Sequence, residues 1–187
     1  HGGSEQCRYP SPRVRKLCQA MVRAGADLVL CQHSHCIGVM EKYEGKMILY
    51  GQGNFYFNLA EEEDNPHWKN GLLLEIDMDS NMTPAYRFYP VKTTDTGIAL
   101  CHGEEEKRIL QELEERSLVL QDEGEWIKRW RAFCLQESWR YHDAISTAFE
   151  SSPYQPSEWF RHYLDCEAHT DVWRQLYPTW NANDTLE

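Results

Sequence analysis

The sequence lacks long hydrophobic runs and is poor in positive charge. Its 187 residues contain no apolar stretch near the roughly 20 residues that cross a bilayer, which excludes a membrane-spanning segment. Only 19 residues are Lys or Arg, against 30 Asp or Glu, so the net charge is −11. Such a surface repels a phosphate backbone, and we expect no general binding to nucleic acid. An acidic protein that handles phosphate needs local cations, and bound metal is one source of them.

The sequence also lacks a C-x-x-C pair, and its seven cysteines are an odd number. Both facts argue against a disulfide framework and favour free thiols. Reduced thiols in turn favour a cytoplasmic location. A cell-surface location stays open, because the chain opens on His1 without an initiator methionine or a signal segment, and address signals could lie upstream of it.

What is present is a globular composition, and its periodicity predicts an α/β fold for the first hundred residues. Aromatic residues make up 12% of the chain, enough for a packed core. Apolar residues at three- and four-residue steps predict a helix over residues 13–23, with Ser11 as its N-cap and Gly25 as its stop. Strands are expected at residues 28–31, 37–43, 46–50, 71–78, 85–91 and 98–100. A helix that leads into a buried strand is typical of layered α/β folds.

The character of the chain changes at Gly103. The pattern predicts a helix over residues 104–120, a longer one after Gly124, and one or two short helices beyond Pro153 and Pro156. Large aromatic side chains recur there at helical spacing, which is more typical of core packing than of a carbohydrate-binding surface. We therefore divide the chain into residues 1–102 and a helical, Trp-rich extension over residues 103–187.

Two histidines one residue apart, His33 and His35, follow the strand expected at residues 28–31. Residues two apart in an extended chain share a face, so Cys31, His33 and His35 are expected to point the same way. They would lie past the carboxyl end of a buried strand, where open α/β sheets place their ligands. Imidazoles placed like this can reach one metal ion, or each of a close pair. The H-x-H spacing alone is a weak signal.

The neighbouring cysteines allow a different interpretation, a structural zinc site built from Cys31, His33, His35 and Cys36. Four ligands within six residues are cramped compared with the usual two-plus-two spacing. Buried free thiols are the simpler interpretation of both cysteines. The remaining histidines have no partner at ligand spacing and are expected to be surface or helix-packing residues: His67, His102, His142, His162 and His169.

Five motifs follow one another in the first part of the chain. They are His1-Gly2-Gly3-Ser4-Glu5, Gly25-Ala26-Asp27-Leu28-Val29, His33-Ser34-His35, Glu41-Lys42-Tyr43-Glu44-Gly45-Lys46 and Gly53-Asn54-Phe55. In this order they resemble the C-terminal half of the bacterial capsule-synthesis (CapA, or poly-γ-glutamate synthesis, PGA_cap) family of calcineurin-like metallophosphoesterases. The resemblance covers residues 1–92. It implies half of an αββα-type metallophosphatase fold, a mixed sheet with a flanking helix, followed here by an all-helical extension.

The resemblance also implies a metal site and a reaction. His1 resembles the family's isolated metal ligand, and His33 and His35 resemble its paired ligands. Such a site holds two divalent ions, and Mn, Fe and Zn all suit imidazole and carboxylate ligands. The ions activate a bridging water for in-line attack on phosphorus. The implied substrate is a phosphoester in the metabolism of a capsule or envelope polymer, either poly-γ-glutamate or a polysaccharide.

Residues beside these motifs are candidates for other roles. Glu5 and Asn54 are candidate catalytic residues, and Gln32, Ser34 and Asn54 are candidate substrate-binding residues. Gln32 stands where the wider superfamily usually has glycine. The family's remaining ligands, an Asp, a Gly-Asp motif and an Asn-His pair, precede the motif that His1 begins. We therefore expect this chain by itself to be inactive and to bind divalent metal weakly or not at all.

A further alternative follows from the same resemblance. The fold could serve as a non-catalytic binding or assembly module of polymer synthesis.

Half of a two-layer fold also leaves a sheet edge or an apolar face uncovered, which is unstable in water. We expect the helices after Gly103 to dock on the sheet through Trp126, Trp130 and Phe133, and a residual apolar surface to favour a homodimer.

Overall fold

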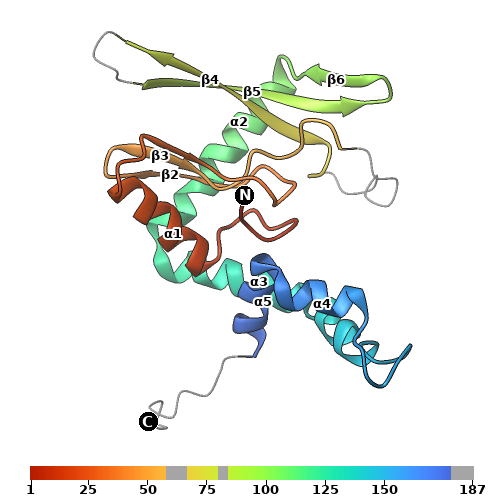
Figure 1. Cartoon of the computed structure of the whole chain (residues 1–187). Coiled ribbons are helices and arrows are strands. Elements are labelled where there is room, and N and C mark those ends of the chain that lie inside the picture. Colours follow the sequence, from red (N-terminus) through yellow and green to blue (C-terminus); the bar gives the residue numbers. More distant parts are fainter. Residues whose placement is uncertain (58–66, 80–83, 178–187) are drawn as a thin grey trace. The chain divides into compact units, whose positions relative to one another are not determined.

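The computed structural model describes residues 1–57, 67–79 and 84–177, and the chain divides into two compact units, His1–Trp126 and Ile127–Glu187. The first unit is a mixed α/β structure and the second is helical, which confirms the predicted fold class (Figure 1). The first unit continues past residue 102, where the sequence suggested a boundary. The reason is the helix at residues 104–117, which packs against the strands of that unit.

Helix α1 (Pro12–Arg23) begins and ends where the sequence predicts. The backbone N–H of Val14 donates to the Ser11 Oγ at 3.1 Å, and Pro12 occupies the first helical position. Gly25, with φ of +108°, follows the last turn, where a left-handed residue is common. The helix therefore delivers the chain directly into the first strand.

The first sheet contains strands β1 (Leu28–Leu30), β3 (Lys46–Leu49) and β2 (Met40–Tyr43), in that order. β1 and β3 are parallel, whereas β2 and β3 form an antiparallel hairpin. The hairpin turns at Glu44 and Gly45, which both have positive φ, +48° and +80°, as a two-residue type I′ turn requires. The sheet is thus mixed, as expected.

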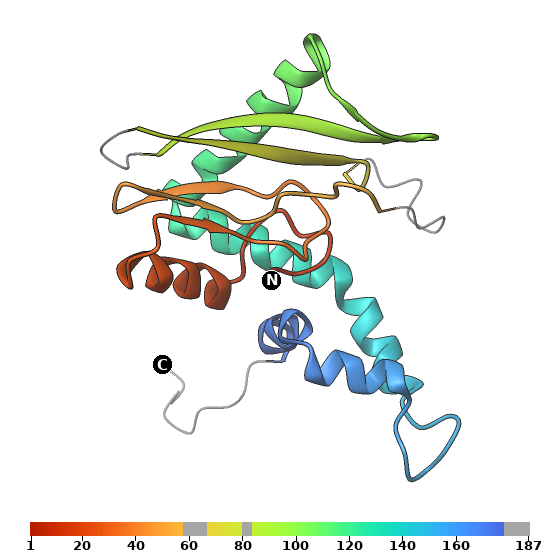
Figure 2. The same cartoon turned by 45° about the horizontal axis from the view of Figure 1, so that its top comes forward.

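A second, antiparallel sheet contains β4 (Asn70–Met78), β5 (Pro84–Thr94) and β6 (Gly97–Leu100). In Figures 1 and 2 the β1-β3-β2 sheet lies between this second sheet and α1. The strands predicted from the sequence are therefore present, but they form two small sheets.

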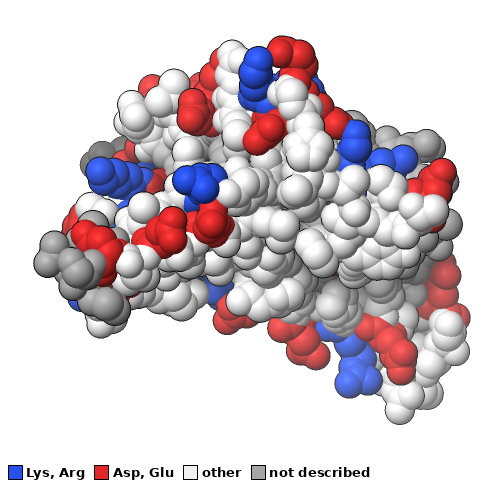
Figure 3. Space-filling view, turned by 90° about the horizontal axis from the view of Figure 1, so that it is seen from above, with Lys and Arg blue, Asp and Glu red and all other residues white. Residues whose placement is uncertain are grey.

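Seen from the side of the second sheet, Lys and Arg lie next to Asp and Glu, and the described residues of that face form no continuous basic patch (Figure 3). The ion pairs of the first unit include Arg87–Glu75 at 3.1 Å and Lys92–Glu105 at 2.6 Å. Among the described residues, no helix combines the length and the apolar character needed to cross a membrane.

Helix α2 (Glu104–Ser117) completes the core of the first unit. Its buried residues Ile109 and Leu113 share one apolar cluster with residues from the loops and strands of both sheets: Ile37, Leu49, Leu72 and Cys101. A short 3₁₀ helix, η2 (Leu118–Gln121), follows and leads into helix α3 (Glu123–Ser146). α2 therefore belongs to the same unit as the strands that its apolar face covers.

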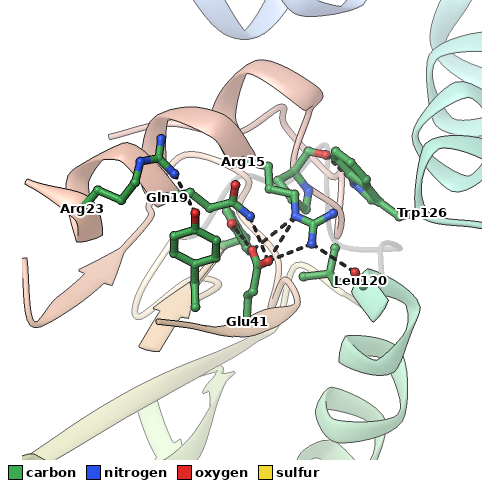
Figure 4. Close-up of polar contacts among 9 residues, drawn as sticks. Arg15, Gln19, Arg23, Glu41, Leu120 and Trp126 are labelled. Carbon is green, nitrogen blue, oxygen red and sulfur yellow. Dashed lines mark hydrogen bonds and ion pairs between the residues drawn. The ribbon is translucent and has the colours of Figure 1, made fainter. Parts of the chain in front are cut away.

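A buried polar network joins α1 to the β2–β3 hairpin (Figure 4). Three side chains donate hydrogen bonds to the Glu41 carboxylate. The distances are 2.7 Å from the Arg15 guanidinium, 2.6 Å from the Tyr50 hydroxyl and 3.0 Å from the Gln19 amide. Arg15 also donates to the Leu120 carbonyl at 3.0 Å. The Arg15–Glu41 pair thus links α1, the hairpin and η2.

Trp126 packs on this network instead of on a sheet. Its indole Nε1–H donates to the Pro10 carbonyl at 3.0 Å, and the Arg15 guanidinium lies 4.4 Å from its ring centroid. The expected docking of Trp126 on strands is thus replaced by docking on the segment that precedes α1. Such a cation–π contact adds to the burial of the ring.

The second unit contains most of α3, together with α4 (Glu158–Asp165) and α5 (Glu167–Leu176). Trp130, Tyr141 and Tyr163 are buried in it. Trp139 and Trp159, by contrast, are exposed, so the prediction that the tryptophans face a core is correct for only part of the set. All seven cysteines of the chain are free thiols; Cys166 is half-buried and the other six are buried.

Candidate metal centre

The N-terminal segment lies alongside the loop that follows β1. The Gly2 N–H donates to the Gln32 carbonyl at 2.6 Å, and the Gln6 N–H donates to the Ser34 carbonyl at 2.7 Å. Gly2 and His33 form a parallel bridge. This pairing carries His1 to the His33–His35 segment, although more than thirty positions separate them in the sequence.

The structure brings the three predicted histidines into one row. The ring centroids of His1 and His33 are 4.7 Å apart, and those of His33 and His35 are 6.3 Å apart. An ion about 2.1 Å from each ligating nitrogen lies roughly 3 Å from each centroid, so two rings that share it have centroids roughly 4.5–6.5 Å apart. Both neighbouring pairs fit that range. The three histidines do not, however, form a cluster in which one ligand nitrogen from each residue lies within 4.8 Å of the other two.

The backbone reason for this proximity differs from the predicted one. β1 ends at Leu30, and His33 and His35 have φ of +124° and +54°, so they lie in a loop and not in an extended strand. Cys31 does not share their face, because its Sγ lies 3.5 Å from the Sγ of Cys18 in α1. Left-handed backbone at a residue other than glycine costs about 1–3 kcal/mol and is concentrated at functional sites. Both histidines of the H-x-H motif have positive φ in this loop.

Asn54 fixes the orientation of His35. The amide nitrogen of Asn54 donates to the carbonyls of Trp68, at 2.9 Å, and of His35, at 3.3 Å. Its Oδ1 is therefore the atom that meets His35 Nδ1 at 2.8 Å, and Nδ1 must carry the proton. The lone pair of His35 then lies on Nε2. A hydrogen bond that fixes the tautomer in this way is the usual support of a metal-ligating histidine.

Two aromatic rings contact the same imidazole. The His35 ring stacks on Trp68 with centroids 4.6 Å apart, and it meets Phe57 at 4.6 Å. Phe57 in turn meets Trp68 edge-on at 5.3 Å. These rings hold the imidazole between apolar walls, so His35 has little rotational freedom. No sequence motif signalled Trp68, which lies beyond the recognised segments.

Residues 1–59 match the family model of the bacterial capsule synthesis protein PGA_cap. This part of the chain is similar to the bacterial capsule synthesis family. The matched residues include the three histidines and Asn54. The PGA_cap segment thus supplies the whole row of imidazoles and the amide that orients one of them.

Two curated proteins are similar to the first part of the chain. The "PGA biosynthesis protein CapA" of Bacillus subtilis (strain 168) is 31% identical over 91 residues, which cover 49% of this chain and 23% of that protein. The "Capsule biosynthesis protein CapA" of Bacillus anthracis is 41% identical over 58 residues, 31% of this chain and 14% of that protein. The chain therefore spans less than a quarter of the length of these relatives in either match.

The other candidate residues of the PGA_cap segment have different surroundings. Ser34 is 1% exposed, and its hydroxyl donates to the Cys36 carbonyl at 3.1 Å, so its side chain is turned inward. Gln32 is exposed and donates to Gln52 at 2.9 Å. Glu5 lies half-buried in the turn before Gln6, on the strand-like segment that begins with His1.

The structure does not support the alternative of a Cys31–His33–His35–Cys36 zinc site. Cys31 is directed at Cys18, and these four side chains do not form a ligand cluster among the described residues. Cys36 is 1% exposed and accommodated within the core. Both cysteines are packing residues.

A small pocket, lined by Arg8, His67 and Arg116 together with the carboxylate of Glu112, adjoins the loop that carries Trp68. Arg116 donates to the carbonyls of Ile37 and Gly38, both at 3.1 Å. Burial, followed by the charge of Arg8, lowers the pKa of Arg116 to about 10. Burial and both arginines also lower the pKa of His67, whose Nδ1 contacts the Arg8 guanidinium. Because a guanidinium only donates, His67 is neutral at this contact.

The tautomer of His35 is testable without any metal. We expect imidazole ¹⁵N chemical shifts to show Nδ1 of His35 protonated and Nε2 unprotonated at neutral pH. Replacing Asn54 with leucine removes the acceptor, so the spectrum should move toward a mixture of tautomers. The matched variant Gln52→Leu, which breaks only the exposed pair with Gln32, should leave His35 unchanged. A wild-type His35 protonated on Nε2 would contradict the assignment.

Proposed function

We propose that this chain is the C-terminal portion of a CapA-like, metal-dependent phosphoesterase of capsule or envelope polymer biosynthesis. In this proposal His1, His33 and His35 are metal ligands, and further ligands, including carboxylates, come from residues outside this chain. The bound ions would supply an activated water and polarise the phosphoryl oxygens. The substrate class is a phosphoester connected with poly-γ-glutamate or a polysaccharide.

The observation that carries the proposal is the row of three imidazoles with His35 held by Asn54. Asn54 holds the Nε2 lone pair of His35 ready for a cation. Trp68 and Phe57 limit its rotation and keep part of the surroundings apolar, which strengthens electrostatic interactions. Arg8 and Arg116, offset in part by Glu112, leave a net positive charge near the same loop, which would attract an anionic group of the substrate.

Asn54 has a supporting role in this proposal. Its amide is used completely by His35 and Trp68, so it orients a ligand and does not contact substrate. Glu5 keeps the candidate role of a catalytic carboxylate, because its turn lies on the segment that pairs with the histidine loop. Gln32 is the exposed candidate for contact with substrate.

The proposal predicts metal binding at the histidine row and no turnover by this chain alone. Three neutral imidazoles leave two dications without the negative charge that balances them, so we expect weak binding of Mn²⁺ and no hydrolysis of a simple phosphodiester. Paramagnetic Mn²⁺ should broaden the NMR signals of His1, His33 and His35 first. The double variant His33→Ala/His35→Ala should lose this broadening, and His102→Ala, an exposed histidine elsewhere, should retain it.

The decisive activity test uses the longer protein that supplies the remaining ligands. Loss of either His33 or His35 should reduce metal-dependent phosphoesterase activity by at least about a hundredfold, because each side chain acts on the ion that generates the nucleophile. If the longer protein supports polymer synthesis equally well with both histidines replaced, the non-catalytic assembly module is the better description of the fold.

A further inference from the structure

A second cluster of ligand-type side chains lies in the helical unit, outside the PGA_cap segment. The ligand atoms of His162, Cys166 and His169 all lie within 4.8 Å of one another. Within the described part of the chain, this is the one group of three or more His, Cys, Asp or Glu side chains that meets this limit. His162 is exposed and His169 is buried among aromatic rings, as expected of surface and helix-packing histidines, but the sequence pattern did not predict that Cys166 lies beside both.

The break between α4 and α5 creates the cluster. α4 ends at Asp165, and Cys166 has the extended angles φ −79° and ψ 122° while it caps both helices. In one continuous helix, residues seven apart are separated by roughly 10 Å along the axis. The break instead turns α5 so that the rings of His162 and His169 have centroids 5.1 Å apart, nearly perpendicular at 81°.

The partners of His169 hold it in place as they would hold a metal ligand. Its ring stacks on Tyr163 with centroids 4.1 Å apart and planes 7° from parallel. Its Nδ1 meets the Tyr141 hydroxyl at 2.9 Å, and a hydrogen bond to the ring is the usual way to orient a metal-ligating histidine. His169 is buried, Cys166 half-buried and His162 exposed, so an ion could enter from the His162 side.

We propose that His162, Cys166 and His169 bind a zinc ion. Two imidazoles and one thiolate suit Zn²⁺, whereas Mg²⁺ and Ca²⁺ prefer oxygen ligands. In a tetrahedral site with bonds of about 2.0–2.3 Å, ligand atoms are roughly 3.5 Å apart, so small side-chain rotations close the observed cluster around an ion. Three protein ligands leave the fourth position to water. The ion would fasten α4 to α5 across their break.

Cobalt substitution tests this proposal, because Co²⁺ replaces Zn²⁺ in tetrahedral sites and a thiolate ligand produces a charge-transfer band in the near ultraviolet. Titration of the purified, reduced chain with Co²⁺ should produce this band, and Zn²⁺ should abolish it. Cys166→Ser should lose the band, and His162→Gln should weaken Co²⁺ binding at least tenfold. His142→Ala, an exposed histidine of the same unit, and the double variant His33→Ala/His35→Ala should both retain it.

Thermal unfolding provides a second measurement. A ligand that binds only the folded state raises its stability, so Zn²⁺ should raise the melting temperature of the wild-type chain but not that of Cys166→Ser. Absence of the charge-transfer band from the folded wild-type chain, or a band that persists in Cys166→Ser, would overturn the proposal. The site is independent of the histidine row, and a negative result here leaves the proposed phosphoesterase function untouched.

Discussion

Replacing Glu41 with alanine should lower the free energy of unfolding by about 3 kcal/mol, because it leaves the largely buried Arg15 without its carboxylate partner. The two side chains are 15% and 11% exposed. Three donors lose their acceptor at once, those of Arg15, Gln19 and Tyr50. Chemical denaturation of the variant, monitored by tryptophan fluorescence, measures the loss.

A matched carboxylate provides the control. Asp27 pairs with Lys46 at 2.5 Å, a distance similar to that between Glu41 and Arg15, but its side chain is 68% exposed. An exposed pair contributes at most about 1 kcal/mol, so Asp27→Ala should have a small effect. Equal losses in the two variants would show that burial of the Glu41 network is not what stabilises the fold.

Glu41 should also make the free energy of unfolding depend on pH. Burial alone would raise the pKa of the Glu41 carboxyl, but the hydrogen bonds from Arg15 and Tyr50 and the charge of Arg15 outweigh burial, so the pKa lies below the ordinary 4.5. The stabilisation is complete above that value and is lost as the pH falls through the lowered pKa. The difference in the free energy of unfolding between the wild type and Glu41→Gln should therefore become smaller below pH 4.5.

Replacing Gly71 with alanine should both destabilise the first unit and disturb the histidine row. A Cβ at this position would lie 2.1 Å from the Asn54 carbonyl oxygen and 2.8 Å from its carbon, and both are backbone atoms. The strand must move, at a cost of about 3 kcal/mol or more. Because Asn54 moves with it, His35 should lose its orienting hydrogen bond.

Two measurements distinguish these effects. Denaturation should show the loss of stability, and the imidazole ¹⁵N spectrum of the folded fraction should show a mixture of His35 tautomers. Gly124→Ala, in the first turn of α3, is the control, since alanine is better than glycine in a helix and should be neutral or stabilising by up to about 1 kcal/mol. A Gly71→Ala protein as stable as the wild type would refute the close packing of β4 against Asn54.

Much of the fold follows from local sequence signals. Ser11, Pro12 and Gly25 mark the ends of α1, and Glu44-Gly45 marks the hairpin, because capping and turn formation depend on a few neighbouring residues. Apolar periodicity likewise predicts the strands of the second sheet and helix α2. It does not indicate how strands pair, and the division into two sheets was therefore not predicted.

The site was predictable in its histidines but not in its support. His33 and His35 were found through the motif, yet the expected two-residue alternation fails, because positive φ values at both residues place them in a loop. Trp68 and His67 come from a segment without a recognisable motif, and only the tertiary structure brings them to the site. The cluster at Cys166 depends on the break between α4 and α5, and neither a proline nor a glycine marks that break in the sequence.

Burial of the thiols has a consequence for how long the chain resists oxidation. Burial raises the pKa of Cys36 to about 11 and that of Cys134 to about 12, so the reactive thiolate of each is scarce at neutral pH. An oxidant must also wait for the fold to open before it reaches them. The lifetime of these thiols is therefore set by the rate of local unfolding, and both would stay reduced even in an oxidising compartment while the fold holds. Half-buried Cys166 is the one cysteine whose oxidation need not wait for unfolding.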